Sequence, residues 1–376
     1  MGGERSVVTI TSDNLSDVLI AELNGLLIQM MKDNHVDLEI KSERASYRVP
    51  AQQINIDAIL RQVGTSEALK DIKVQVEIAS PTAENVKFVE DAARNSNITL
   101  IVPPLDFTVR AIYGNQQVEI SEFNAFIERM IAIPDNVDPS QITTGVVVEP
   151  DGTLRPVPTK IMLIEGKYYA VINSLTNSTY TVISNPLKFT DVENHWAKEA
   201  INNMGSRMIV SGKGSGMFSP DEDVTRAKLA AIIVRGLGLR LEQGESTFSD
   251  VKVTDWYSSS IQTAYEYGLI NGFEEGTFQP NDKVTREQAM LILSKAMDVT
   301  ELSGQSGSQT AASILSAFSD TYAVSNWALN GIAESVNAGI ISGRSSGLID
   351  PKAYITRAEV SIIVQRLLQK SNLIDE

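Results

Sequence analysis

Apolar residues in the second half of the chain recur at helical spacing after three Thr-Arg pairs. The matching positions are Ile232, Ile233 and Leu237, then Ile292, Leu293 and Met297, then Ile363, Val364 and Leu368. This spacing predicts three amphipathic helices, each with one buried face. Since one short helical unit cannot bury such a face alone, we expect the three to pack on one another.

In the first half, short apolar runs between turn residues predict strands, and a few segments predict helices. A helix is expected from Leu15 to Met31, a short one after Asn55-Ile56-Asp57, and a third beginning near Pro81-Thr82-Ala83-Glu84. The expected strands are 36–40, 47–49, 72–78, 98–102, 107–113, 117–120, 126–133, 145–148, 160–164, 168–172 and 180–183. This pattern predicts an α+β module that ends in antiparallel strands.

The second half contains three internal repeats with markers at fixed offsets. Each repeat has a tryptophan, then a glycine, a proline and a Thr-Arg pair at the same distances from it. The tryptophans are Trp196, Trp256 and Trp327; the glycines Gly212, Gly272 and Gly343; the prolines Pro220, Pro280 and Pro351; the pairs begin at Thr225, Thr285 and Thr356. Each repeat predicts helix, loop, helix, with the tryptophan on the first helix and the Ser/Thr-Asp pair before it as the helix entry.

These markers set the expected domain boundaries. They are 1–185 for a spacer or presenting module, and 186–242, 243–301 and 302–376 for the three repeats. A Gly/Ser/Gln-rich stretch, 303–309, is expected to be a flexible insertion before the third repeat.

Composition excludes several classes of function. The 376 residues include 32 Lys+Arg and 47 Asp+Glu, which gives a formal net charge of −15. An extended basic surface that binds nucleic acid is therefore not expected. There is no cysteine and there are only two histidines, which argues against disulfides, thiolate metal sites and histidine-based catalysis. We expect no cofactor, no metal and no membrane insertion.

The first residues lack an apolar signal-peptide core, so we expect a processed chain or part of a longer protein.

The repeats resemble the S-layer homology (SLH) family of bacterial, mostly Gram-positive, surface proteins. The family's Thr-Arg-Ala-Glu motif is intact at Thr356-Arg357-Ala358-Glu359, and it is altered at Thr225-Arg226-Ala227-Lys228 and Thr285-Arg286-Glu287-Gln288. The resemblance implies an all-α, pseudo-threefold trimer of helix–loop–helix repeats. It also implies binding of secondary cell-wall polysaccharide through pyruvylated N-acetylmannosamine, in grooves between repeats. The first half resembles the segment that precedes such triplets in Paenibacillus-type exported proteins.

The chemistry of an acidic-sugar site can be argued from residue types. An arginine just after a helix N-cap places a guanidinium beside free amides and the positive end of the dipole, which suits a carboxylate. A tryptophan offers an apolar face to a sugar ring, and a glycine loop brings backbone donors close. The candidate ligand-binding residues are Arg226, Arg286, Arg357, Trp196, Trp256, Trp327, Ser211, Gly212, Asn271, Gly272, Ser342, Gly343, Lys213 and Arg344.

Each candidate also has a structural interpretation. The tryptophans could be core residues, the glycines could only form turns, and the arginines could form salt bridges with Asp221 or Asp282. Lys228 could strengthen anion attraction near Arg226 or weaken the helix cap. Ser174-Leu175-Thr176 resembles the cleavage site of autoproteolytic GAIN-type sandwiches without its histidine, and a plain hairpin turn is the simpler interpretation.

The sequence therefore predicts a secreted, non-catalytic anchor at the cell wall or S-layer. Two other functions stay open. One is a C-terminal fragment of a wall-bound glycoside hydrolase, with its chemistry in the first half. The other is a self-assembling S-layer subunit, and further domains of a larger protein are possible partners.

Overall fold

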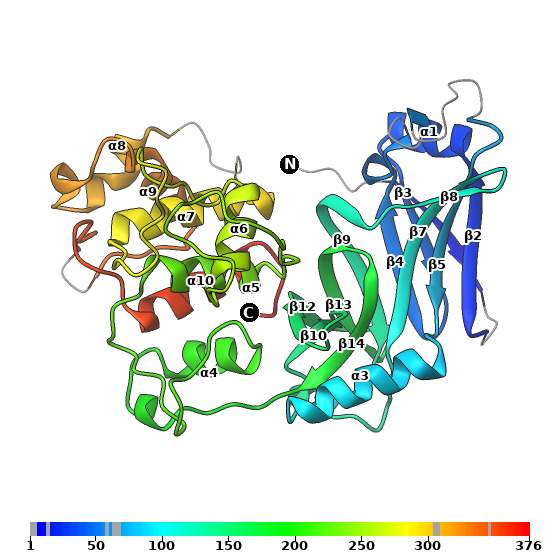
Figure 1. Cartoon of the computed structure of the whole chain (residues 1–376), viewed down its shortest axis with the longest axis horizontal. Helices are drawn as coiled ribbons and strands as arrows, with labels where there is room; N and C mark the ends of the chain where they lie inside the picture. Colours follow the sequence, from blue (N-terminus) through cyan, green and yellow to red (C-terminus); the bar gives the residue numbers. More distant parts are fainter. Residues whose placement is uncertain (1–5, 13–15, 57–59, 62–68, 304–308, 345–346) are drawn as a thin grey trace. The chain divides into compact units, whose positions relative to one another are not determined.

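The computed structural model describes residues 6–12, 16–56, 60–61, 69–303, 309–344 and 347–376 (Figure 1). The chain divides into two compact units, Met1–Asn185 and Pro186–Glu376. Two expectations fall largely outside the described residues: the short helix after Asn55-Ile56-Asp57 and the insertion at 303–309.

The first unit is built from two β-sheets. Within the described residues, the first sheet has six strands in the order β1 (Val7–Thr11), β3 (Asp37–Lys41), β4 (Ala45–Pro50), β9 (Glu122–Ala132), β13 (Lys167–Thr176) and β12 (Thr159–Ile164). The second has eight, following β11 (Leu154–Val157), β10 (Thr144–Val148), β14 (Ser178–Ser184), β7 (Leu105–Tyr113), β5 (Lys73–Ala79) and β2 (Val18–Asn24), with β6 (Thr99–Leu100) on β14 and β8 (Gln116–Glu119) on β7. The β1–β3 pair is parallel, and the other described pairs are antiparallel.

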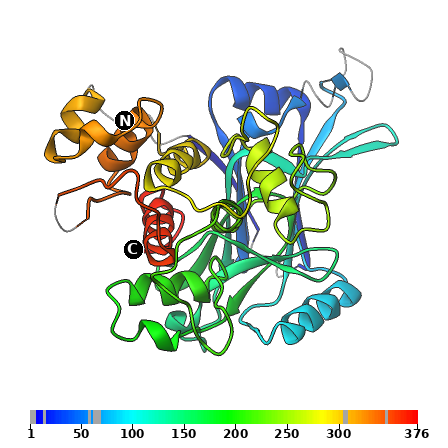
Figure 2. The ribbon, with the colours of Figure 1, turned by 60° about the vertical axis from the view of Figure 1, so that its left-hand side comes forward.

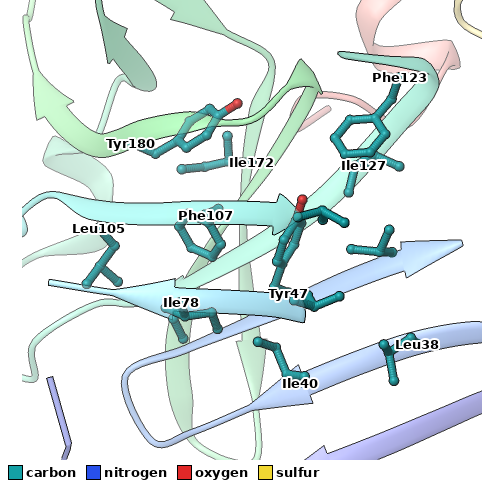
Figure 3. Packing of buried hydrophobic residues seen from close by; sticks show 14 of the residues in the cluster. Leu38, Ile40, Tyr47, Ile78, Leu105, Phe107, Phe123, Ile127, Ile172 and Tyr180 are labelled. Carbon is teal, nitrogen blue, oxygen red and sulfur yellow. The ribbon is translucent and has the colours of Figure 1, made fainter. Parts of the chain in front are cut away.

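The two sheets face each other across one apolar core. The rings of Tyr47, from β4, and Phe107, from β7, meet edge to face with centroids 5.3 Å apart (Figure 3). Phe107 makes a similar contact with Tyr180 of β14. Figure 2 shows helices α1 (Gly25–Asp33) and α3 (Ala83–Asn95) at opposite ends of the strands. The ring contacts between β4, β7 and β14 show that inward-facing residues of both sheets form this apolar core.

The predicted α+β module is wrong, because the first unit is β-rich. The segment expected to be one helix from Leu15 to Met31 contains strand β2, and only its second part is helical, in α1. Strands β1 and β11 were not anticipated. The apolar run before α1 fits a helical pattern when taken alone. In the fold it pairs with β5, and this pairing satisfies its backbone N–H and C=O groups as a strand.

In the second unit, helices pair between repeats. Helices α4 (Lys198–Ser206), α6 (Ser258–Glu266) and α9 (Leu329–Asn337) follow the three tryptophans, and α5 (Arg226–Gly236), α7 (Arg286–Val299) and α10 (Arg357–Lys370) follow the threonines. A short helix, α8 (Ala311–Ile314), precedes the third repeat. Helix α5 packs on α6, α7 on α9 and α10 on α4, so each second helix contacts the first helix of another repeat.

The expected all-α trimer of helix–loop–helix repeats is also wrong. Much of each repeat is irregular or 3₁₀ backbone, as at Thr190–Val192 and Thr321–Ala323. Isolated β-bridges join the repeats: Asp223 to Thr356, Thr225 to Lys283 and Thr285 to Tyr354. Extended backbone before each threonine thus pairs with another repeat, because its amide and carbonyl groups have no partner within their own.

Candidate functional site

The arginine of each Thr-Arg pair contacts the glycine loop of another repeat. Arg226 Nε donates to the Phe278 carbonyl at 2.7 Å, and Arg286 Nε to the Ile349 carbonyl at 2.8 Å. Arg357 Nε donates to the Phe218 carbonyl at 2.8 Å. We call these contacts the first, second and third junctions, after Arg226, Arg286 and Arg357 respectively. The arginines therefore link repeat one to two, two to three and three to one.

The remaining guanidinium contacts differ among the junctions. Arg226 Nη2 donates to the Asn271 carbonyl at 3.1 Å, and Arg357 Nη2 to the Ser211 carbonyl at 2.7 Å. Each of these guanidinium groups also lies over a buried ring, Phe278 or Phe218, at 4.4 and 4.2 Å. Arg226 and Arg357 thus bind backbone carbonyls. The described ion pairs do not include the alternative pairing of a motif arginine with Asp221 or Asp282, although the Asp282 charge acts on Arg226.

The second junction contains a bound carboxylate from the protein itself. Arg286 Nη1 donates to Glu359 Oε1 at 2.8 Å, and Arg344 donates to both oxygens of Glu359, at 3.0 and 3.2 Å. Arg344 also pairs with Asp350 at 2.7 Å. Burial lowers the pKa of Arg286, and the Glu359 charge opposes that shift. Of the predicted site residues, Arg286 and Arg344 therefore meet around an internal anion.

The helix amides assumed to be free are already bonded. The N–H groups of Arg226, Arg286 and Arg357 donate to the carbonyls of Asp282, Ala353 and Glu222, at 2.9 Å each. The next amide of each helix donates to the carbonyl of Pro280, Pro351 or Pro220. The threonine hydroxyl accepts from the third amide in every case. An anion at this place would be held by side chains, since the backbone donors are already used.

A second basic residue per repeat escaped the sequence analysis. These residues are Arg235, Lys295 and Arg366, each nine positions after the motif arginine. Arg235 Nη1 donates to Ser211 Oγ at 3.2 Å, and Arg366 Nη1 to Ser342 Oγ at 3.1 Å. With the Asn271 amide oriented to satisfy its neighbours, its oxygen accepts from Lys295 Nζ at 3.2 Å. The repeated nine-residue spacing was the signal that could have found them.

Two cations converge on Ser211 in the third junction. Arg357, from repeat three, binds its carbonyl, and Arg235, from repeat one, binds its hydroxyl. Burial and the nearby Arg357 charge together lower the pKa of Arg235. Burial likewise lowers the pKa of Arg357. Two partly desolvated guanidinium groups at one exposed serine form a favourable place for an anion.

The marker glycines are needed for close packing. A Cβ on Gly212, Gly272 or Gly343 would lie within 2.9 Å of a phenylalanine ring of the same repeat, and equally close to a backbone carbonyl. None of the three has a positive φ. Positive φ occurs elsewhere in these loops, for example at Ser219, Gln279 and Asp350, just before the prolines. The glycine loops are therefore fixed by sterics.

The aspartate of each Ser/Thr-Asp pair accepts two hydrogen bonds from backbone amides in the glycine loop of its own repeat. Asp250 accepts from the amides of Phe278 and Gln279, both at 2.7 Å. Asp191 does so at Phe218 and Ser219, and Asp320 at Ile349 and Asp350. These aspartates do not cap the helices predicted to follow them. Each holds the backbone whose carbonyl the motif arginine binds.

The tryptophans are surface residues. Trp196, Trp256 and Trp327 are 69%, 65% and 54% exposed, and each stands two residues before its helix. His195 packs beside Trp196, with ring centroids 5.3 Å apart. Three large exposed rings at equivalent positions are unusual for packing residues and suit a sugar-binding surface.

The residue after each marker glycine varies. Lys213 pairs with Glu222, and Arg344 pairs with Glu359. Phe273 takes this place in repeat two, where Arg226 lies 4.8 Å from its ring. Ser211, Asn271 and Ser342, just before the glycines, are all exposed. The motif arginines therefore meet the loop residues of a neighbouring repeat, with a different chemistry at each junction. The described contacts do not join the tryptophans to these junctions.

Ser174-Leu175-Thr176 lies in a buried crossover between the two sheets of the first unit. Strand β13 pairs with β9 and β12, whereas β14 pairs with β7, β10 and β6, so these residues form no hairpin turn. The Thr176 hydroxyl lies 3.3 Å from Ser174 Oγ, 3.4 Å from Tyr180 Oη and 3.2 Å from Arg155 Nη2. None of these three groups is a general base at neutral pH, so the contacts give no support to self-cleavage.

Among the described residues, no helix combines the length and apolar character needed to cross a membrane. The same part of the chain contains no group of three or more His, Asp or Glu side chains arranged to hold a metal ion.

Residues 188–230, 247–290 and 317–361 each match the S-layer homology domain family. The resemblance first drawn from the Thr-Arg motifs is thereby confirmed in the C-terminal half.

Similar proteins are much longer than this chain. An amylopullulanase of Thermoanaerobacterium thermosulfurigenes is 28% identical over 371 residues, which cover 98% of this chain and 18% of that protein. Exoglucanase XynX of Acetivibrio thermocellus is 36% identical over 199 residues, 53% of this chain and 18% of that protein. The surface-layer 125 kDa protein of Lysinibacillus sphaericus is 31% identical over 177 residues, 46% of this chain and 14% of that protein. This chain therefore spans less than a fifth of these relatives.

Proposed function

Because three S-layer homology domains lie within residues 188–361, we propose that this chain anchors a secreted surface protein to the bacterial cell wall. The ligand is secondary cell-wall polysaccharide, and the recognised group is pyruvylated N-acetylmannosamine. The junctions between repeats bind it. On this proposal the repeats divide at 186–242, 243–301 and 302–376, and residues 1–185 act as a spacer or presenting module without catalysis.

The observation that carries the proposal is the pair of guanidinium groups at Ser211. Arg357 and Arg235 come from different repeats, and among the described residues no carboxylate is hydrogen-bonded to either. The charges of Glu222 and Asp191 act on Arg357 without such a bond. The carboxylate of a pyruvate ketal would supply the direct ionic partner, and burial strengthens the attraction.

The exposed tryptophans supply the second part of the proposed site. Their rings would pack on the sugar or on the ketal methyl group, while Ser211, Asn271 and Ser342 offer short polar side chains. Several junctions on one rigid unit would bind a polymer with repeated acidic groups more durably than one junction alone.

The experiment is calorimetric binding of purified pyruvylated wall polysaccharide, with a chemically depyruvylated sample alongside. We expect binding that disappears with the pyruvate. Equal binding to both samples would contradict carboxylate recognition and favour neutral-sugar binding. Binding to neither sample would overturn the proposed function.

The tryptophans allow a first mutational test. Trp196→Ala should weaken binding about five- to thirtyfold, since loss of one aromatic contact costs roughly 1–2 kcal/mol. The matched control is Tyr322→Ala, because Tyr322 is 89% exposed and is not a proposed site residue. Thermal unfolding should be unchanged in both variants. Equal effects of the two substitutions on affinity would exclude a specific role for Trp196.

Two other functions rest on the similarities. The amylopullulanase similarity extends through the first unit, so the alternative is that this unit belongs to a wall-bound glycoside hydrolase. Release of reducing sugar from pullulan by the full chain would support it. The surface-layer similarity favours a self-assembling subunit, which ordered sheets formed on removal of denaturant would support.

A further inference from the structure

One helix position carries a different charge in each repeat. It is the third residue after the threonine: Lys228 in repeat one, Gln288 in repeat two and Glu359 in repeat three. Gln288 and Glu359 make the same capping box, since each side chain accepts from the threonine amide at 3.0 Å. The backbone at this position is thus alike, and the side-chain charge is what differs.

Glu359 shows what a carboxylate does at a junction. It lies between Arg286 of repeat two and Arg344 of repeat three, and hydrogen bonds join it to both. Arg286 is 3% exposed, so this carboxylate neutralises a charge that solvent barely reaches. The second junction therefore already contains an anion in the place where a ligand carboxylate would bind.

At the other two junctions, no carboxylate of the described residues is hydrogen-bonded to the motif arginine. Nearby carboxylates act there through their charge alone, from Asp250 and Asp282 on Arg226 and from Glu222 and Asp191 on Arg357. Among the described residues, no hydrogen bond joins Nη1 of Arg226 or of Arg357 to a partner. Gln288, which belongs to the first junction, is neutral. Lys228, in the third junction, pairs with Glu222 at 3.4 Å, and Glu222 is shared with Lys213. The third junction thus keeps an excess of positive charge.

We propose that the residue at this position decides which junctions bind an acidic sugar. The first and third junctions bind the ligand carboxylate through Arg226 and Arg357, and Glu359 closes the second by occupying Arg286. This inference rests on the proposed function and assigns its sites: about two of the three junctions are available, since one guanidinium face grips one carboxylate.

The test counts binding sites for a pyruvylated N-acetylmannosamine monosaccharide by calorimetry on the full chain. Gln288→Glu should close the first junction and halve the number of sites, leaving about one. Glu359→Gln should open the second and raise the number to about three. Both substitutions keep a side chain that forms the capping box in this structure. The double variant, with the two residues exchanged, should return the number of sites to the native value.

Each outcome decides a different point. Three equal sites in the native chain, or no change in Gln288→Glu, would overturn the inference and leave the proposed function standing. No binding by the native chain would overturn the proposed function itself. Glu359→Gln removes the partner of a buried arginine, so circular dichroism must first show that it folds. Gln288→Glu removes no ion pair and remains decisive if Glu359→Gln does not fold.

Discussion

At the scale of single residues, the first unit buries a charge without a carboxylate partner among its described residues. Arg129 is fully buried, and its guanidinium group lies 4.9 and 4.8 Å from the rings of Tyr47 and Tyr180. It donates to the carbonyls of Ile127 and Thr176, at 2.9 and 2.6 Å. Carbonyl oxygens and aromatic faces thus take the place of a counter-ion, and they hold the crossover between the sheets.

The same cluster predicts a pH dependence. Burial raises the pKa of Tyr47 from its ordinary value of 10 to about 12, although the Arg129 charge opposes the shift. Because the unfolded chain loses this proton first, the stabilisation is complete below pH 10 and is lost as the pH rises toward 12. The free energy of unfolding of the first unit should fall by about 1.4 kcal/mol per pH unit in that range.

Urea unfolding followed by circular dichroism at a series of alkaline pH values measures this slope. All three tryptophans lie in the second unit, so their fluorescence separates the unfolding of that unit from the first. Tyr47→Phe should be less stable at neutral pH, because it loses the hydrogen bond to Asn177, but should show a shallower slope. An unchanged slope in Tyr47→Phe would assign the pH effect to other groups.

At the scale of elements, the first helix of each repeat ends in the same left-handed turn. Gly268 and Gly339 follow α6 and α9 with φ of 68° and 71°. Met208 holds the same place after α4 with φ of 63°. The ends of these three helices are thus set by a backbone turn that glycine adopts without strain and methionine does not.

This turn predicts the effect of adding a side chain. Gly268→Ala should lower the free energy of unfolding of the second unit by about 1 kcal/mol, because its Cβ meets open space and only backbone strain is added. Gly268→Asn should cost less, since asparagine tolerates this conformation. Urea unfolding followed by tryptophan fluorescence measures both. Equal losses of unfolding free energy in the two variants would show that the cost does not come from the left-handed backbone conformation at residue 268.

At the scale of the whole molecule, the second unit closes on itself. The last repeat returns to the first through Arg357, which binds the loop carbonyls of Phe218 and Ser211, and through the packing of α10 on α4. Similar contacts join repeats one to two and two to three. A unit connected in this way should unfold as a whole, because loss of one junction removes partners from two repeats.

Arg357→Lys tests this cooperativity. An ammonium group cannot reach both carbonyls in the geometry of a planar guanidinium, so about 2 kcal/mol of stability should be lost. Tryptophan fluorescence in urea should still show one transition, shifted to lower denaturant. Arg366→Lys is the matched control, with a smaller expected loss, since the described hydrogen bonds of Arg366 go to Ile340 and Ser342 of its own repeat. Two separate transitions in Arg357→Lys would contradict closure.

Much of the second unit could be predicted from its sequence. Fixed offsets of tryptophan, glycine, proline and Thr-Arg identified the three repeats and their family, because repeated units keep the residues that each fold position requires. The apolar stripes of α5, α7 and α10 were visible for the same reason, and Ile292 is the only half-buried member of that set. The sequence by itself therefore determined which residues recur and which helix faces are buried.

Only the tertiary structure decided which groups these residues contact. In the folded chain, each motif arginine binds a loop carbonyl of another repeat, and the first helix amides donate to carbonyls of another repeat. Glu359 is hydrogen-bonded to Arg286. The tertiary structure also turned the start of a predicted helix into strand β2 and the predicted α+β module into two sheets. Spacing along the chain reports the local face of an element, whereas hydrogen-bond partners distant in sequence depend on how the elements pack.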